Sequence, residues 1–326
     1  GIAASIGVLD SDADGLIDRL YAGDTGGNVW RVDMPGNTPN SGTTPWTVHK
    51  LASLGGTSNA DDRRFFSEPS IVRTYISDTI ETTTTDGEGN ESTVVTRQER
   101  PYDAILIGSG DRSTPTDSDT NDMFFMIRDE NIRTTSFVAS PSNEQLAIPT
   151  PIALNDLYDY TDNPFGEFTY PYSAQEKAAL EVLELAVSAK SGWFVDFTAN
   201  GEKSTAEAIA INNVAFFTSF TPADNGNQAQ TCQLSDGSGK LYAVDLTLGT
   251  TVFDWRTWDI AAGIPDTPSI VITKDPDEPD TCTENCDTED NPIDDLATIK
   301  LLAGKVVPLN FNLKTSRTYM YVTESN

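Results

Sequence analysis

The chain has 326 residues, of which 50 are acidic and 21 are basic, so its net charge at pH 7 is −29. This charge argues against nucleic acid and anionic membrane surfaces as partners, because both would repel the chain, and it favours cations. No apolar run approaches the roughly 20 residues that cross a bilayer, so no membrane insertion is expected. The length suits one large all-β domain or two smaller ones.

The first element is an acidic loop, Asp10-Ser-Asp-Ala-Asp-Gly-Leu-Ile-Asp18. Ca²⁺ binds roughly six to eight oxygens, and carboxylates at alternating loop positions can all point inward. Asp10, Asp12 and Asp14 have this spacing, and Gly15 permits the sharp turn after them. The backbone carbonyl of Leu16 and a bidentate carboxylate of Asp18 would complete the shell. The pattern predicts a shortened EF-hand-like calcium loop, against the alternative of an acidic surface turn.

Short segments rich in β-branched and aromatic residues follow, separated by turn signals. With hardly any helix, they predict an all-β sandwich, barrel or propeller. The predicted strands are Ala4–Leu9, Arg19–Ala22, Asn28–Asp33, Ile71–Tyr75, Ala104–Gly108, Met123–Arg128, Trp193–Phe197, Glu207–Ile211, Val214–Phe220, Leu241–Leu246, Val252–Trp258, Ile270–Thr273 and Arg317–Val322.

One helix is predicted near 173–190, packed on the outside of the sheets. Ser173-Ala-Gln-Glu176 is a capping box, and apolar residues follow at helical spacing until Gly192. Two segments, at about 77–101 and 274–295, are rich in Thr, Asp, Glu and Pro and are predicted to be long, acidic, mobile loop insertions.

Weak internal repeats favour the propeller among the all-β folds. Pro69-Ser-Ile-Val72 recurs as Pro268-Ser-Ile-Val271, and a Gly-rich turn with a strand ending in Asp recurs at Asp33, Asp129 and Asp245. A propeller needs radial closure, typically with about 4–8 blades. Residues 1–326 are therefore expected to be the C-terminal part, about half, of one larger ring. Since Gly1 is not a natural start, the remaining blades and a leader are expected to precede it, the alternative being a small ring.

Three cysteines, Cys232, Cys282 and Cys286, allow one disulfide in any of three pairings and leave one thiol. They favour an oxidising, extracytoplasmic compartment. A zinc site is not expected, because the only histidine is His49, which is interpreted as a surface or strand residue. A second acidic group, Asp111, Asp117, Asp119 and Asp122, gives a weaker indication of another ion site.

The run Asp10–Asp18, followed by Arg19–Asp24 and Gly27–Asp33, resembles the calcium blade of the PilC/PilY proteins, the tip-associated factors of bacterial type IV pili. Further motifs follow in the family's order, so the resemblance spans nearly the whole chain. They are Ile107–Asp111, Gly192–Asp196 with Gly201–Lys203, Val214–Pro222, Cys232 and Leu241–Gly249. The closing segment Ser316–Glu324 is only loosely similar to the family's ending.

This resemblance implies the C-terminal β-propeller region of such a factor, in a ring of roughly seven blades. It implies that Asp10, Asp12, Asp14, the Leu16 carbonyl and Asp18 hold Ca²⁺. It also implies a non-enzymatic role in pilus assembly, in control of retraction and twitching, and in surface attachment. The expected partners are pilins or minor pilins and a host or abiotic surface. The expected location is the pilus tip or outer cell surface, reached through the periplasm.

Two other functions are considered. Quinone-dependent dehydrogenases also use propellers with calcium, and Trp30, Trp193, Trp255 or Trp258 could stack on a cofactor. Tryptophan near strand ends more often packs in the core than binds a cofactor. The carboxylates of Asp10–Asp18 lie in one contiguous loop, which suits a structural ion better than an ion shared with a cofactor. The other alternative is a generic salt-adapted surface adhesin or structural protein.

Overall fold

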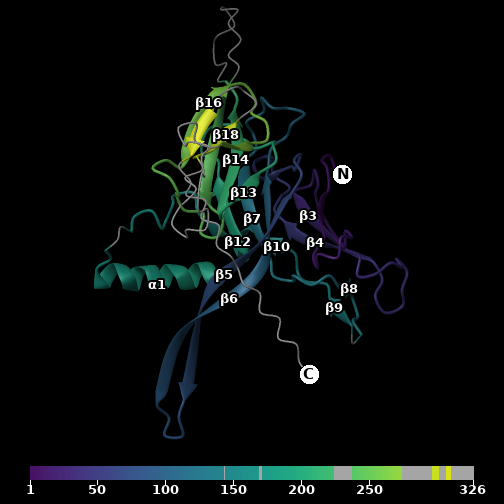
Figure 1. Ribbon diagram of the computed structural model, residues 1–326, viewed down its shortest axis with the longest axis vertical. Coiled ribbons are helices and arrows are strands. Elements are labelled where there is room, and N and C mark those ends of the chain that lie inside the picture. Colours follow the sequence, from purple (N-terminus) through teal and green to yellow (C-terminus); the bar gives the residue numbers. More distant parts are fainter. Residues whose placement is uncertain (143, 169–170, 224–236, 274–295, 301–305, 310–326) are drawn as a thin grey trace, which may run out of the picture.

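The computed structural model describes residues 1–142, 144–168, 171–223, 237–273, 296–300 and 306–309. Within these residues the chain forms four mainly antiparallel sheets in succession, a small parallel strand pair and one α-helix (Figure 1). Along each sheet the antiparallel strands follow one another in chain order, as in a propeller blade. Cys232, Cys282, Cys286, the predicted 274–295 loop and the predicted strand Arg317–Val322 lie outside the described residues.

The first sheet contains β1 (Gly7–Leu9), β2 (Arg19–Gly23), β3 (Asn28–Asp33), β4 (Thr47–Ser53) and, parallel to β4, β10 (Ile152–Ala153). The second contains β5 (Ser70–Thr85), β6 (Glu91–Gly108), β7 (Met123–Asp129), β12 (Gly192–Asp196) and, parallel to β12, β11 (Tyr158–Asp159). The third contains β13 (Ile209–Ile211), β14 (Val214–Thr221), β15 (Ser238–Asp245) and β16 (Thr257–Ala262). The fourth contains β17 (Ser269–Thr273), β18 (Leu296–Lys300) and β19 (Val306–Leu309). A small pair joins β8 (Ser136–Val138) to β9 (Gln145–Ala147), and two 3-10 turns are η1 (Asn59–Asp61) and η2 (Leu154–Asp156).

The sheets pack face to face in chain order, and the second sheet shows why. Successive side chains of a strand point to opposite faces. In β6 and β7 the odd-numbered residues, such as Ile105 and Phe125, pack against Tyr21 and Val29 of the first sheet. The even-numbered residues Leu106 and Phe124 belong to the cluster that also contains β14 and β15 of the third sheet. The second sheet is therefore buried on both faces, as an interior blade is.

This arrangement confirms the predicted all-β, propeller-type fold with one inserted helix. Successive meanders stacked through apolar faces are what radial repetition requires. No closed sheet is formed by the described strands. The closure of the ring and its number of blades stay predictions.

The predicted helix is α1 (Ala174–Ser188), and its capping box is present. The Glu176 amide donates to the Ser173 hydroxyl at 3.2 Å, and the Ser173 amide donates to the Glu176 carboxylate at 2.7 Å. Only Val187, in the last turn, is buried, and it joins the core of the second and third sheets. The helix thus docks by one end and projects sideways from the sheets (Figure 1).

Replacing Ser173 with alanine is expected to destabilise the start of α1 by about 1 kcal/mol, because the Glu176 amide loses its acceptor. Few tertiary contacts hold this end, so the loss is expected to stay local. Amide hydrogen exchange over the first two helical turns is the measurement, with acceleration of roughly fivefold expected. Ser173→Thr keeps the hydroxyl and is the control. Equal exchange in Ser173→Ala and wild type would contradict the role of the cap.

The prediction of a mobile loop at 77–101 is wrong. This segment is a long hairpin in which β5 and β6 continue beyond the sheet and protrude from the body (Figure 1). Its many Thr and Val residues are β-branched and favour strands, which outweighs the acidic composition. The turn is closed at Asp86, whose carboxylate accepts from the Glu88 and Asn90 amides at 2.9 Å each.

Other differences concern strand boundaries. β4 was not predicted at all, because Thr47-Val-His-Lys-Leu-Ala-Ser53 has no regular alternation of apolar and polar residues. β16 begins at Thr257, later than predicted, because Phe253 and Trp255 pack as a connecting segment against the third sheet. Within the described residues, no helix combines the length and the apolar character of a membrane span.

The outer face of the first sheet carries an apolar row. Val8, Leu20, Val32 and Val48 are direct cross-strand neighbours on β1 to β4, so they point to the same face. Val8 is 54% exposed and Val48 is 60% exposed. An apolar sheet face is typical of one that packs on another sheet. The predicted ring requires such a surface on this side.

Candidate metal centre

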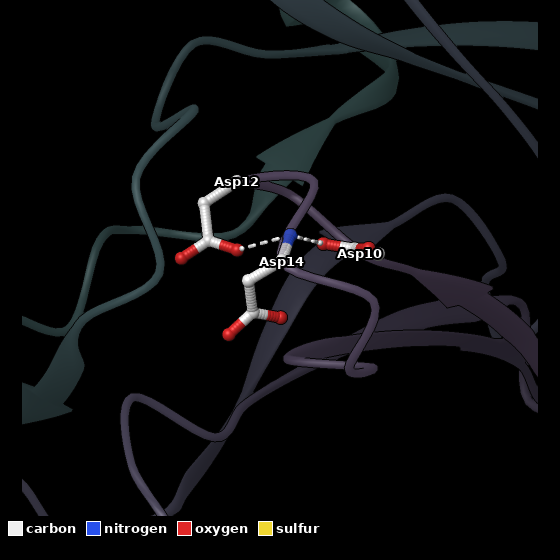
Figure 2. Close-up of side chains that lie close together, drawn as sticks. All are labelled: Asp10, Asp12 and Asp14. Carbon is white, nitrogen blue, oxygen red and sulfur yellow. Dashed lines mark hydrogen bonds between the residues drawn. The ribbon is translucent and has the colours of Figure 1, made fainter.

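The acidic loop lies between β1 and β2, at one edge of the first sheet. Asp10, Asp12 and Asp14 each place a carboxylate oxygen within 4.8 Å of the other two. Among the described residues, these three form the cluster of acidic, histidine or cysteine side chains that could hold a metal ion. Asp10 is half-buried and the other two are exposed. Figure 2 shows the three side chains arranged around the Asp14 amide. We call this group the acidic triad. Its oxygens are the hard donors that Ca²⁺ prefers.

The backbone of the loop curls around the triad. The Asp14 amide donates to Asp10 Oδ1 and Asp12 Oδ1, both at 3.2 Å (Figure 2). The Gly15 amide donates to Asp10 Oδ2 at 2.8 Å. Gly15 has a φ of 89°, as predicted for the residue at the sharp turn, and Ala13 has a φ of 62°. A left-handed φ favours glycine, so the sequence places Gly15 where the turn requires it.

The other two predicted ligands lie differently. The Asp18 carboxylate accepts from the Ser11 amide at 3.1 Å and from the Ser11 hydroxyl at 2.6 Å, so it closes the base of the loop. Leu16 follows the triad, its amide donates to Asp14 Oδ1 at 2.8 Å, and its side chain is exposed. The structure thus brings together three of the five predicted ligands. The ligand roles of Asp18 and of the Leu16 carbonyl stay predictions.

A buried ion cluster lies beneath the loop, at the interface of the first and second sheets. We use this name for Arg19, Arg31, Asp33, Asp103 and Asp129, whose side chains are all at most 1% exposed. Arg19 Nη1 lies 2.6 Å from Asp103, and Arg31 lies 2.6 Å from Asp33 and 2.7 Å from Asp129. Buried charges of this kind persist only when paired and hydrogen-bonded.

Arg73 connects the loop to this cluster. Its Nη1 donates to the Ser11 carbonyl at 2.5 Å, while its Nε donates to Asp103 Oδ1 at 2.9 Å. The Ser11 hydroxyl is also 2.9 Å from that of Thr134. Because Arg73 is on β5 and Asp103 is on β6, the loop of the first sheet is tied to the second sheet.

The cluster also holds the segment after β7. Arg31 donates to the carbonyls of Asn131 and Arg133 at 2.8 and 3.1 Å, and Arg19 donates to that of Ile132 at 2.7 Å. Three successive carbonyls are therefore bound by guanidinium groups. The segment 131–134 is fixed alongside the acidic loop.

Burial and pairing act in opposite directions on the pKa values of Arg31 and Asp33. Burial would lower the pKa of Arg31, but the Asp129 carboxylate and other neighbours raise it above its ordinary value. Burial raises the pKa of Asp33, and the Arg31 guanidinium opposes that shift. Burial and Asp129 together raise the pKa of Tyr21, which keeps its hydroxyl protonated as a donor to Asp129 at 2.8 Å.

Sequence reasoning missed this cluster, although one signal pointed to it. The repeat of strands that end in Asp marked Asp33 and Asp129, and both prove to be buried acceptors for Arg31. The third member, Asp245, instead accepts from the amides of Thr247 and Leu248 in a turn. The same motif therefore caps a turn in one sheet and pairs charges in two others.

His49 is a strand residue, as one of the two interpretations had it, but it is buried rather than at the surface. It lies opposite Arg31 in the β3–β4 register, and its ring centroid is 4.5 Å from that of Phe137. Burial and the positive charge of Arg31 lower its pKa to about 4, and Asp129 opposes this shift.

Acidification is expected to destabilise the fold through His49. Because its pKa of about 4 in the folded chain is below the ordinary 6.5, the unfolded chain takes up the proton first. The contribution of His49 to the free energy of unfolding is complete above about pH 6.5 and is lost as the pH falls towards 4, with a loss of about 2.5 kcal/mol at pH 4.5. Asp122 acts in the opposite direction, since burial raises its pKa to about 6.

The measurement is therefore a difference between two proteins. Urea unfolding of wild type and of His49→Gln is compared at pH 7 and pH 4.5, so that Asp122 and other groups cancel. The variant is expected to lose less stability on acidification than wild type does. Equal losses would show that His49 does not titrate as described.

Two carboxylates of the second acidic group, those of Asp111 and Asp122, have partners within the fold. Asp111 pairs with Arg64 at 2.9 Å, and Lys203 Nζ donates to the Asp117 carbonyl at 2.5 Å. Asp122 is buried and accepts from the Ser109 hydroxyl at 2.7 Å. The partners of Asp111 and Asp122 favour internal pairing over a second cation site.

Comparison with known proteins adds to this geometry. No family model matches the chain. Over 250 residues, 75% of its length, the chain is 23% identical to a protein of Xylella fastidiosa (strain Temecula1 / ATCC 700964) named "Type IV pilus biogenesis factor PilY1 homolog". The predicted resemblance to the PilC/PilY family is confirmed. The chain spans 14% of the length of this PilY1 relative.

A solved PilY1 structure is also similar to the chain. It is the Pseudomonas aeruginosa PilY1 C-terminal domain, with a TM-score of 0.43 and 18% sequence identity. The similarity covers 76% of this chain and 48% of the PilY1 domain.

Proposed function

We propose that this chain is a calcium-dependent, non-enzymatic propeller segment of a type IV pilus biogenesis factor. The observation that carries the proposal is the acidic triad, in a chain whose curated relative is named as such a factor. We further propose that the parent protein acts at the pilus tip or cell surface, contacts pilins or minor pilins, and supports assembly, control of retraction and surface attachment.

The mechanism of calcium dependence is local electrostatics. Three carboxylates within 4.8 Å of one another repel when they are ionised. A divalent cation bound by Asp10, Asp12 and Asp14 would remove that repulsion and fix the loop. Because Ser11 is tied to Arg73 and Thr134, the ordered loop would also stabilise the boundary between the first and second sheets.

The positions of the tryptophans favour a non-enzymatic role. Trp193 is buried and donates to the Leu246 carbonyl at 2.9 Å, while Trp30 donates to Asp24 at 2.8 Å in the first sheet. Trp255 and Trp258 contact one another beside the third sheet. These rings belong to three separate places, so they do not form one stacking site. A quinone absorbance band in the native protein would revive the dehydrogenase alternative.

Pilus counts in the parent bacterium test the proposal. Electron microscopy would compare wild type, a strain lacking the gene, and a strain with Asp14→Ala, with Asp86→Ala as a control in an exposed turn. We expect few pili in the first two mutants and normal numbers in the control. Normal pili without the gene would refute the pilus role and favour a generic surface protein. Loss of pili in the null strain alone would refute only the calcium dependence.

A further inference from the structure

A cleft of about 510 Å³ opens beside the acidic triad. One wall is the acidic loop from Ser11 to Asp18. The second wall is formed by residues 34–37 and Trp46, and the third by residues 132–134. Asp12 and Asp14 line the cleft, so a ligand inside it would reach the carboxylates proposed to hold the ion.

Part of the cleft is apolar and exposed. Leu16 is 59%, Ile17 is 46% and Trp46 is 40% exposed. The Trp46 indole nitrogen donates to the Gly36 carbonyl at 2.5 Å, so its polar atom is satisfied and its ring is left for packing. Aliphatic and aromatic side chains gathered at a concave surface are typical of a site that binds apolar groups.

The remaining part of the cleft is positively charged. Arg133 is exposed. Its backbone carbonyl accepts a hydrogen bond from the Arg31 guanidinium at 3.1 Å, so the backbone at Arg133 is fixed. In the described part of the chain, no hydrogen bond or ion pair engages the Arg133 guanidinium. Arg73, by contrast, is already bound to Asp103 and to the Ser11 carbonyl. Arg133 is thus the guanidinium of this cleft that is available for an anion.

The ion itself would need further oxygens. Ca²⁺ takes roughly six to eight, and the triad offers three carboxylates. The Asp18 carboxylate is engaged by Ser11 at 2.6 and 3.1 Å. Even with the Leu16 carbonyl, the loop leaves positions that solvent or an incoming carboxylate would fill.

We propose that this cleft binds an extended segment of a partner protein that carries a carboxylate side chain between aliphatic residues. The carboxylate would complete the calcium shell and pair with Arg133, and the aliphatic residues would pack on Leu16, Ile17 and Trp46. This inference depends on the proposed calcium binding. Without the ion, the three negative charges of the triad repel the incoming carboxylate, so recognition is calcium-dependent.

NMR of the 326-residue chain tests the proposal, with the Trp46 indole N–H signal as the reporter, assigned through Trp46→Phe. The probe is a mixture of acetylated, amidated tripeptides with central Glu and with Leu, Ile or Val at both ends. A matched mixture has central Gln. Each is titrated in roughly 5 mM calcium and in roughly 5 mM magnesium, because Mg²⁺ keeps several of its waters and leaves fewer positions for an incoming carboxylate.

We expect the Glu mixture to bind about tenfold more tightly in calcium than in magnesium, and about tenfold more tightly than the Gln mixture. Arg133→Gln is expected to weaken the Glu mixture about fivefold or more, while Arg112→Gln, at an exposed position outside the cleft, has no effect. Calorimetry should show unchanged calcium affinity in Arg133→Gln. That separates the peptide contact from the ion site.

Two results would overturn the inference, and they are distinguishable. If calorimetry finds calcium binding but the Glu and Gln mixtures bind equally, or Arg133→Gln has no effect, the cleft assignment fails and the calcium site stands. If wild type binds no calcium, both the proposed function and this inference fail.

Discussion

Asp14→Ala is expected to weaken calcium binding at least tenfold in a calorimetric titration with excess magnesium present. The variant removes one of three carboxylates whose oxygens lie within 4.8 Å of one another. Contacts between a charged oxygen and its partner contribute about 1.5–3 kcal/mol each. It also removes the acceptor of the Leu16 amide, so the loop loses part of its curled backbone. Wild type is expected to bind with a saturable, one-site isotherm.

Asp86→Ala is the matched control for this experiment. Asp86 also accepts backbone amides in an exposed turn, but it belongs to no acidic triad. Its substitution is expected to leave the isotherm unchanged. An unaltered affinity in Asp14→Ala would remove the site assignment, and no calcium heat in wild type would favour a salt-adapted surface without a specific ion.

Asp129→Ala is expected to cost about 3–5 kcal/mol of the free energy of unfolding, because it breaks a buried ion pair and leaves Arg31 with Asp33 as its remaining carboxylate partner. The same carboxylate accepts from the Tyr21 hydroxyl at 2.8 Å and from the Asn131 amide at 3.1 Å. Urea unfolding at pH 7 is the measurement. The cluster together with Arg73 has equal numbers of guanidinium and carboxylate groups, so removal of one leaves a net buried charge.

Glu144→Ala is the control, since the Glu144 side chain is exposed and a surface carboxylate contributes little to stability. The double variant Arg31→Met/Asp129→Leu is expected to lose less than the sum of the two single losses, because it removes both charges together. A loss below about 1 kcal/mol in Asp129→Ala would show that the cluster relaxes or admits water.

Elements with a clear local signal could be predicted from the sequence. The strand Asn28–Asp33 was placed correctly because it follows a Gly-Gly turn and contains two valines and a tryptophan. The helix start was placed by its capping box, and the acidic triad by its spacing around Gly15. Each of these signals is contained within a few neighbouring residues.

Features that depend on contacts between distant segments could not be predicted. Arg19 and Asp103 are 84 residues apart, and nothing near either residue indicates that they meet. Charged residues on a strand are ordinarily assigned to a face that contacts solvent. This rule gives the wrong face where two sheets pack through buried ion pairs, as the first and second sheets do. Asp18 shows the same limit on a smaller scale, because its partner Ser11 became evident only from the folded loop.

The long hairpin has a mechanical consequence. Beyond Arg73, β5 continues for twelve residues to Thr85, about 40 Å at the rise of an extended strand. A load on the tip pulls both strands in the same direction, so it does not unzip their ladder. The force reaches the body where β6 pairs with β7, from Asp103 to Gly108, and there it shears several hydrogen bonds at once. Arg73 and Asp103 are paired at the base of the hairpin, and Arg73 also donates to the Ser11 carbonyl. Tension on the hairpin would therefore be transmitted through Arg73 to the acidic loop.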